Sequence, residues 1–243
     1  MTEAEWLACD DLGELFEYLE STTALTQRKL RLFEVAYCRR FTSILPEPVL
    51  VSALNVAERF ADGVVADTEL AAVHQVSRTI EDESAMNEEG TPEIDALYYG
   101  AMAVREATSP NAPDYHSGTP ALIEHVMTAM AYASHALLLG GHEQQVAFFG
   151  QVSDSEKMHA IGFVRDIFGN PFRPVAFSPE WRTDTTVSLA RTMYESRDFS
   201  AMPILADALQ DAGCDSAEIL DHCRGPGPHV RGCWVVDLVL GKR

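Results

Sequence analysis

The sequence predicts an all-α protein, an irregular bundle of about ten helices. Apolar residues recur at helical spacing in most segments, and capping residues or prolines mark where those segments begin. No long segment alternates apolar and polar residues as a half-buried strand would. The composition, 47% hydrophobic and 23% charged, is typical of a globular protein with a sizeable core.

Five helices are predicted before residue 110. Thr2 and Glu5 have the spacing of a capping box, and apolar positions 12, 15, 16 and 19 follow on one helix face. A second helix is predicted to begin at Thr26, and a third to run from Pro48 to Asp62. A fourth is predicted to be capped by Asp67, and a fifth to begin at Thr91-Pro92. In the helix after Thr26 the arginines are expected to lie outside the apolar stripe.

The second half is predicted to contain a central helix over 119–139, because that stretch is apolar nearly all round. It also carries Glu124, His125 and His135, which favour a buried core helix over a membrane span. A further helix is expected from Ser153 or Asp154 to Phe168. Residues 169–179 contain three prolines within nine positions and predict a non-helical connector. Helices are then expected over 183–196, 200–212 and 216–223, and the last apolar run, 229–240, is either a helix or a strand.

The connector is the best position for a domain boundary. We therefore expect a helical body over 1–168 and a C-terminal helical segment over 169–243, packed together as one compact unit.

The chain has 37 acidic and 18 basic residues and a formal charge of −19. Such a charge repels nucleic acids and anionic membranes, so neither is an expected partner. Five basic side chains crowd the helix after Thr26: Arg28, Lys29, Arg31, Arg39 and Arg40. They could dock on an acidic face of the same protein or of a partner, and the intramolecular arrangement is the favoured one. The five cysteines and the acidic N-terminus without an apolar run predict free thiols and a cytoplasmic location.

Four C-terminal side chains, Cys214, Cys223, His229 and Cys233, are candidate zinc ligands, because zinc takes four thiolate or imidazole ligands. The spacing lacks a Cys-x2-Cys knuckle, however. His229, Cys233, Val236 and Leu240 also share one face of a helix, so burial in the core is the favoured interpretation. A Cys233–His229 catalytic pair would need Asp237 as orienter, and Asp237 is about 12 Å along the helix from His229. Elsewhere, Glu156-x-x-His159 is half of a di-iron motif, and an exposed helix start is the favoured interpretation.

Several stretches resemble a large paralogous family of uncharacterised planctomycete-type bacterial proteins: TEAEWLAC at 2–9, RDIFGNPFRPV at 165–175 and HCRGPGPHVRGCWVVDLVLG at 222–241. The resemblance implies a bacterial cytoplasmic protein without an assigned activity, and it implies that an apolar residue can replace Cys223.

The expected function is that of a non-catalytic helical module that binds another protein. The alternatives are a zinc-dependent or thiol-dependent enzyme centred on the C-terminal Cys/His cluster, and a small structural zinc domain attached to the helical body. The sequence specifies neither the partner nor the oligomeric state.

Overall fold

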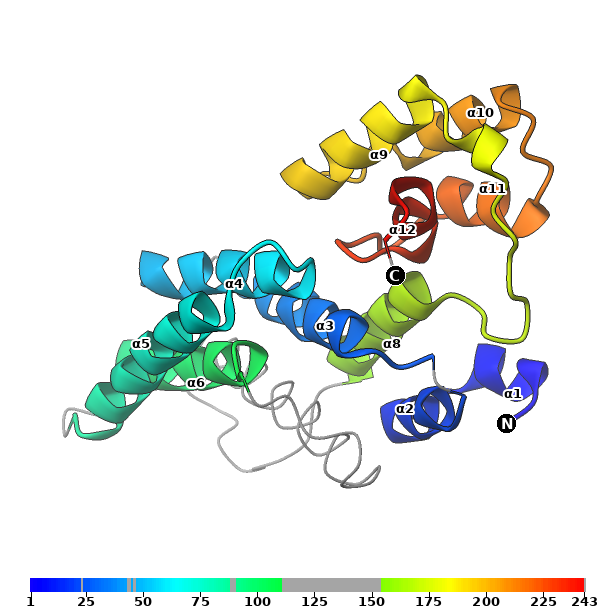
Figure 1. Cartoon of the computed structure of the whole chain (residues 1–243). Coiled ribbons are helices and arrows are strands. Elements are labelled where there is room, and N and C mark those ends of the chain that lie inside the picture. The colour runs from blue at the N-terminus through cyan, green and yellow to red at the C-terminus, as the bar shows by residue number, and fades with distance from the viewer. Residues whose placement is uncertain (23, 43–44, 46, 88–90, 111–153, 243) are drawn as a thin grey trace. The chain divides into compact units, whose positions relative to one another are not determined.

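The computed structural model describes residues 1–242 except 23, 43–44, 46, 88–90 and 111–153. The described residues form helices and irregular segments, and no strand occurs among them, so the predicted all-α class is confirmed (Figure 1). The helices are α1 (Glu3–Ala8), α2 (Leu12–Ser21), α3 (Gln27–Arg39), α4 (Pro48–Ala61), α5 (Asp67–Ala85), α6 (Pro92–Ala107), α8 (Asp154–Phe168), the 3-10 turn η2 (Pro179–Trp181), α9 (Asp184–Ser196), α10 (Met202–Asp211), α11 (Ala217–Arg224) and α12 (Trp234–Leu240). Over this part of the chain, no helix has the length and apolar character needed to cross a membrane. The predicted central helix over 119–139, with Glu124, His125 and His135, lies outside the described residues.

Most helices begin where a side chain satisfies a free backbone N–H of the first turn. The caps at Thr2, Thr26, Thr91, Thr183 and Ser216 each accept a hydrogen bond from the backbone N–H three residues later. The Thr2 cap is a complete capping box, because the Glu5 side chain accepts the Thr2 N–H in return. These predicted starts are therefore confirmed.

Two boundaries differ from the expectation. Asp67 is not the cap of α5; it is the first helical residue, after Ala66, and its charge lies in the first turn. The last helix begins only at Trp234, so His229 precedes it and does not share a helix face with Cys233. Gly232 lies between His229 and Cys233 with φ of +100°, a conformation outside the helical range, so residues 229–233 do not extend the helix.

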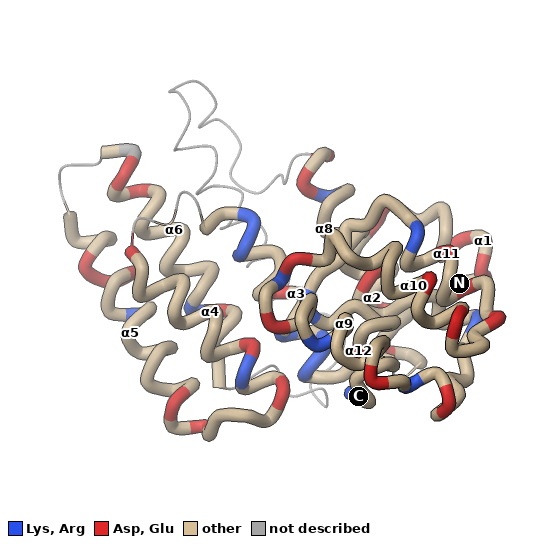
Figure 2. Tube along the Cα trace, turned by 90° about the horizontal axis from the view of Figure 1, so that it is seen from above, with Lys and Arg blue, Asp and Glu red and all other residues tan. Residues whose placement is uncertain are grey.

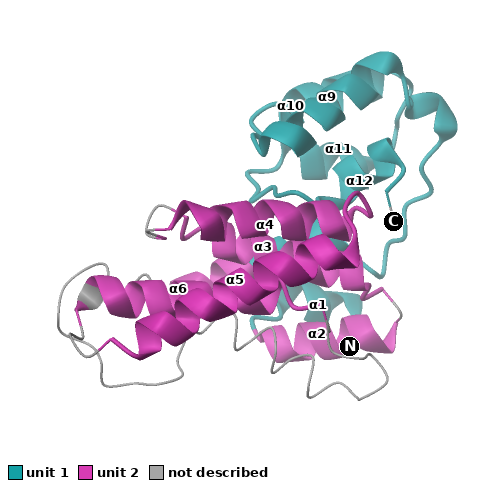
Figure 3. Cartoon of the chain, turned by 60° about the vertical axis from the view of Figure 1, so that its left-hand side comes forward, with its two compact units in different colours: residues 1–10, 161–243 teal, residues 11–160 magenta. Residues whose placement is uncertain are grey.

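The chain divides into two units, one of residues 11–160 and one of residues 1–10 together with 161–243 (Figure 3). The division falls within α8, upstream of the predicted boundary at residue 169. The first ten residues belong with the C-terminal unit, because Glu3 and the carbonyls of α1 bind side chains from 165–173. Such contacts between distant segments leave no local signal in the sequence.

The 11–160 unit is held by apolar helix faces and by buried charges. α2, α3 and α4 contribute apolar residues that are at most 4% exposed, among them Leu15, Phe16, Phe33, Tyr37, Leu50 and Leu54. Acidic residues lie along most helices, with basic ones between them (Figure 2). Arg28, Arg39 and Arg40 pair with Asp62, Glu58 and Glu156, at 3.1, 2.7 and 2.8 Å respectively. The expected intramolecular pairing of these arginines is confirmed.

One arginine of α3 lies inside the fold and not outside it. Arg31 is 4% exposed and donates to the carbonyls of Ala107 and Ser109 at the end of α6, at 2.8 and 2.9 Å. These carbonyls lie where a helix leaves acceptors unsatisfied, so they compensate the buried guanidinium.

The Glu156-x-x-His159 pair lies at the start of α8 in the same unit. Glu156 binds Arg40 and accepts a weak hydrogen bond from Tyr37, and His159 is exposed. Glu156 thus serves an ion pair, and the preference for a polar helix start over half of a di-iron site is consistent with this arrangement.

In the unit of residues 1–10 and 161–243, α9 to α12 enclose an apolar core that includes Ala190, Met193, Leu205, Leu209, Ile219, Val235, Val236 and Val239. The three C-terminal cysteines, Cys214, Cys223 and Cys233, belong to the same core, and each is at most 3% exposed. The connector over 169–178 is irregular, as predicted, and leads into η2.

Candidate metal centre

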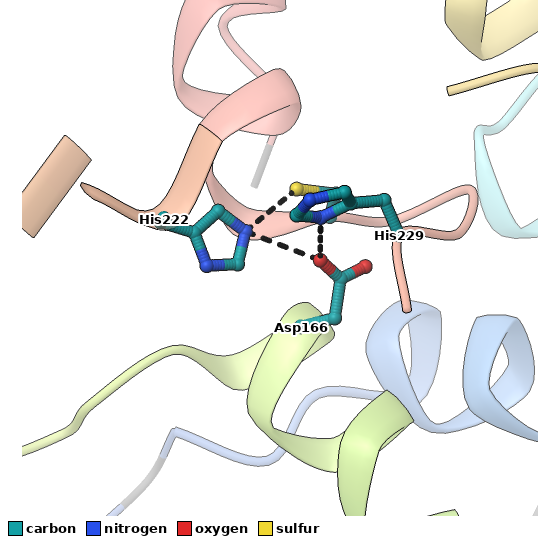
Figure 4. A group of neighbouring side chains, drawn as sticks. Asp166, His222 and His229 are labelled. Carbon is teal, nitrogen blue, oxygen red and sulfur yellow. Dashed lines mark hydrogen bonds and ion pairs between the residues drawn. The ribbon is translucent and has the colours of Figure 1, made fainter. Parts of the chain in front are cut away.

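One group of possible metal ligands converges among the described residues: Asp166, His222, His229 and Cys233. Each residue offers one ligand atom, and these four atoms all lie within 4.8 Å of one another. Figure 4 shows both imidazole rings turned toward the Asp166 carboxylate. All four residues belong to the unit made of 1–10 and 161–243.

The contacts within this group centre on one carboxylate oxygen. Oδ1 of Asp166 lies 2.8 Å from Nδ1 of His229 and 3.1 Å from Nε2 of His222. The same Nε2 of His222 lies 3.2 Å from Sγ of Cys233. The other carboxylate oxygen, Oδ2, accepts the backbone N–H of Val230 at 2.8 Å. That hydrogen bond fixes the carboxylate plane and leaves Oδ1 for the imidazoles.

Each side chain is placed by a different element. Asp166 lies in the last turn of α8, His222 in the last turn of α11, and Cys233 at the N-cap of α12. His229 follows the Gly-Pro turn. In this turn Gly227 has φ of +80°, and a Cβ added to it would lie 2.9 Å from the backbone nitrogen of His229. This turn therefore requires glycine immediately before the Pro228-His229 pair.

The turn is also packed against α8. A Cβ at Gly162 would lie 2.8 Å from the Pro228 ring, so the absence of a side chain at Gly162 lets the turn approach the helix closely. Gly162 and Asp166 are four residues apart and lie on the same face of α8. The helix thus positions both the carboxylate and the turn that carries His229.

Electrostatics favour a cation in this group. Burial raises the pKa of the Asp166 carboxyl, but hydrogen bonds from His222 and His229 outweigh burial, so its pKa is lowered and it is ionised at neutral pH. Burial, reinforced by the Asp166 charge, raises the pKa of the Cys233 thiol well above 9. A bound metal cation would offset both the burial of the Cys233 thiol and the nearby Asp166 charge, and would therefore favour the Cys233 thiolate.

The surroundings orient the ligands and shield them from water. The side chains of Asp166 and His229 are 2% and 8% exposed, that of His222 is 20% exposed, and Cys233 is fully buried. The Trp234 ring lies against His222 with centroids 5.1 Å apart. Nε2 of His229 is buried without a hydrogen-bond partner among the described residues. It is not the ring atom that faces the carboxylate, which is Nδ1, so it adds no ligand atom to the converging group.

The donor set suits zinc. Cys, two His and Asp combine one soft, two borderline and one hard ligand, and zinc accepts all three kinds in a tetrahedral site. With bonds of about 2.0–2.3 Å, tetrahedral zinc needs about 3.3 Å between nitrogen and oxygen ligands and about 3.6 Å between nitrogen and sulfur. The three close contacts of 2.8–3.2 Å must therefore widen by a few tenths of an ångström, and the other pairs of ligand atoms, which lie within 4.8 Å, must adjust to the same spacing.

Thiol catalysis fits the geometry poorly. A Cys–His–Asp triad binds the thiol and the carboxylate to opposite nitrogens of one imidazole. Here Cys233 and Asp166 both approach Nε2 of His222, and Cys233 is fully buried with a raised pKa. The thiol lacks both a correctly oriented base and access to a substrate.

Of the four ligands predicted from the sequence, the structure brings together His229 and Cys233. Cys214 and Cys223 lie in the apolar core of the same unit, outside the converging group, and burial raises the pKa of Cys223 to about 12. The converging group contains His222 and Asp166 in their place. Neighbouring residues of a helix point about 100° apart, so only one of His222 and Cys223 faces the group. His222 lay within the sequence cluster; Asp166 had no such signal.

A scan against protein-family models, a search of curated proteins and a search of solved structures each found no match to this chain.

Proposed function

We propose that this chain is a zinc-binding protein in which Asp166, His222, His229 and Cys233 hold one structural zinc ion. The observation that carries the proposal is the convergence, in a shielded site, of four ligand atoms from separate segments. All four residues lie in one unit of the chain, and three of their side chains are at most 8% exposed.

A structural role follows from the number of protein ligands. Catalytic zinc keeps one position open for water or substrate, whereas four protein ligands close the tetrahedron. The ion would join the ends of α8 and α11, the turn before His229 and the start of α12. It would thereby cross-link an irregular segment, residues 225–233, that contributes little apolar surface of its own.

Protein binding remains the expected task of the whole molecule, because a closed metal site supplies scaffold and not chemistry. A thiolate ligand also requires a reducing environment, in agreement with the cytoplasmic location expected from the sequence.

The proposal is tested by the metal content of the purified full-length protein, measured by elemental analysis. We expect one zinc per chain in the wild type, and its loss in Asp166→Asn and Cys233→Ser. Cys214→Ser is the matched control, because Cys214 is also buried in the same core but lies outside the group. Wild-type protein without zinc, or zinc lost from Cys214→Ser but retained in Asp166→Asn, would contradict the proposal.

A further inference from the structure

The N-terminal helix α1 is anchored at its C-terminal end by one side chain of α8. Nη2 of Arg165 donates to the carbonyls of Trp6, Leu7 and Cys9, at 3.3, 2.9 and 3.0 Å. These carbonyls lie at the end of α1, where the helix leaves acceptors unsatisfied and its dipole favours a cation. Trp6 itself is 1% exposed.

The other end of α1 is anchored by the connector. Glu3 accepts a hydrogen bond from Asn170 at 2.8 Å and pairs with Arg173 at 2.5 Å. Both ends of α1 are therefore held by side chains from 165–173. A helix of six residues is far too short to be stable alone, so its order depends on such contacts.

The same segment carries the metal ligand. Asp166 follows Arg165 directly, so the last turn of α8 presents the carboxylate to the site and the guanidinium to α1. A second connection runs through Gly169, where an added Cβ would lie 3.2 Å from the Trp234 ring that covers His222. A ligand that fixes Asp166 and His222 must also fix the segment that anchors α1.

We propose that zinc occupancy controls the docking of α1, through the last turn of α8 and the connector after it. This inference rests on the proposed function, because it assigns a regulatory consequence to the same site. By linkage, the effect is reciprocal: zinc favours docked α1, and docked α1 raises zinc affinity. Couplings of this kind typically change affinity by roughly 5- to 150-fold.

The test uses the full-length protein, with zinc and after chelation, and follows amide hydrogen exchange in residues 3–10. We expect zinc removal to accelerate exchange there, while α5 (Asp67–Ala85), in the other unit, is unchanged. Zinc affinity is measured in parallel by competition with a chromophoric chelator. Arg165→Gln should release α1 in both states and weaken zinc binding at least 5-fold.

A second variant perturbs α1 without touching the neighbour of Asp166. Glu3→Gln removes the ion pair with Arg173 and should weaken zinc binding in the same direction. Its matched control is Glu180→Gln, an exposed glutamate of η2 in the same unit, which should bind zinc like the wild type.

The outcomes separate the two proposals. Stoichiometric zinc with identical exchange of residues 3–10 in both states, and wild-type affinity in Arg165→Gln and Glu3→Gln, would overturn the linkage and leave the zinc site intact. Absence of zinc binding by the wild type would overturn both.

Discussion

Replacing Gly169 with alanine should loosen the candidate metal site from a position outside its ligand set. Gly169 ends α8 with φ of +69°, a conformation that costs a residue with a Cβ about 1–2 kcal/mol. The new methyl group would also lie 3.2–3.3 Å from three atoms of the Trp234 ring, which rests against His222. Overpacking of this kind adds about 1–3 kcal/mol.

Gly241 provides the matched control, because it lies in the same unit, has the same φ of +69°, and an added Cβ there meets nothing within 4 Å. Gly241→Ala should lower the free energy of unfolding by the backbone cost alone. Gly169→Ala should lower it by about 1–3 kcal/mol more and should also weaken zinc binding.

The assay is urea unfolding followed by tryptophan fluorescence. All three tryptophans, Trp6, Trp181 and Trp234, belong to the unit that contains the site, so the signal reports that unit alone. Equal losses of stability in Gly169→Ala and Gly241→Ala, with unchanged zinc affinity, would refute the claim that the Trp234 contact positions His222.

Three further predictions concern other parts of the fold. Arg39→Ala should lower the free energy of unfolding by about 3–5 kcal/mol, because it removes the ion pair of 2.7 Å with the buried Glu58. Thermal unfolding followed by circular dichroism measures the loss, and a loss below about 1 kcal/mol would contradict the prediction. Native-state thiol labelling should modify the half-buried Cys9 first and Cys38 slowly, because burial raises the pKa of Cys38 to about 12. Fast labelling of Cys38 would contradict its burial. Hydrogen bonds from Asn170 and Arg173 lower the pKa of Glu3 from 4.5, so the contribution of Glu3 to α1 docking is present above pH 4.5 and is lost as the pH falls below it. The difference in amide hydrogen exchange of α1 between wild type and Glu3→Gln should therefore shrink as the pH falls. A constant difference would argue against the contact.

The helices were predictable because their signals are local. Thr26, Thr91, Thr183 and Ser216 bind backbone groups only three residues away, so the pattern that marks a cap is complete within one turn. The division into units was not predictable, because Arg165 and Glu3 tie together segments at opposite ends of the chain. No periodicity in either segment records such a contact.

The candidate site was half predictable for the same reason. His229 and Cys233 stand close together in a conspicuous Cys/His cluster, and both belong to the converging group. Choosing His222 over Cys223 requires knowing which face of α11 packs on the core. Identifying Asp166 as a ligand requires knowing that α8 lies against the turn that precedes His229, which is a property of the tertiary structure alone.

The most direct measurement of the central claim is X-ray absorption at the zinc edge of the zinc-loaded, full-length protein. We expect one sulfur ligand at about 2.3 Å and three nitrogen or oxygen ligands at about 2.0–2.2 Å. Spectra with two or more sulfur ligands would place Cys214 or Cys223 at the metal, and spectra without sulfur would remove Cys233; either result would contradict the assignment of Asp166, His222, His229 and Cys233.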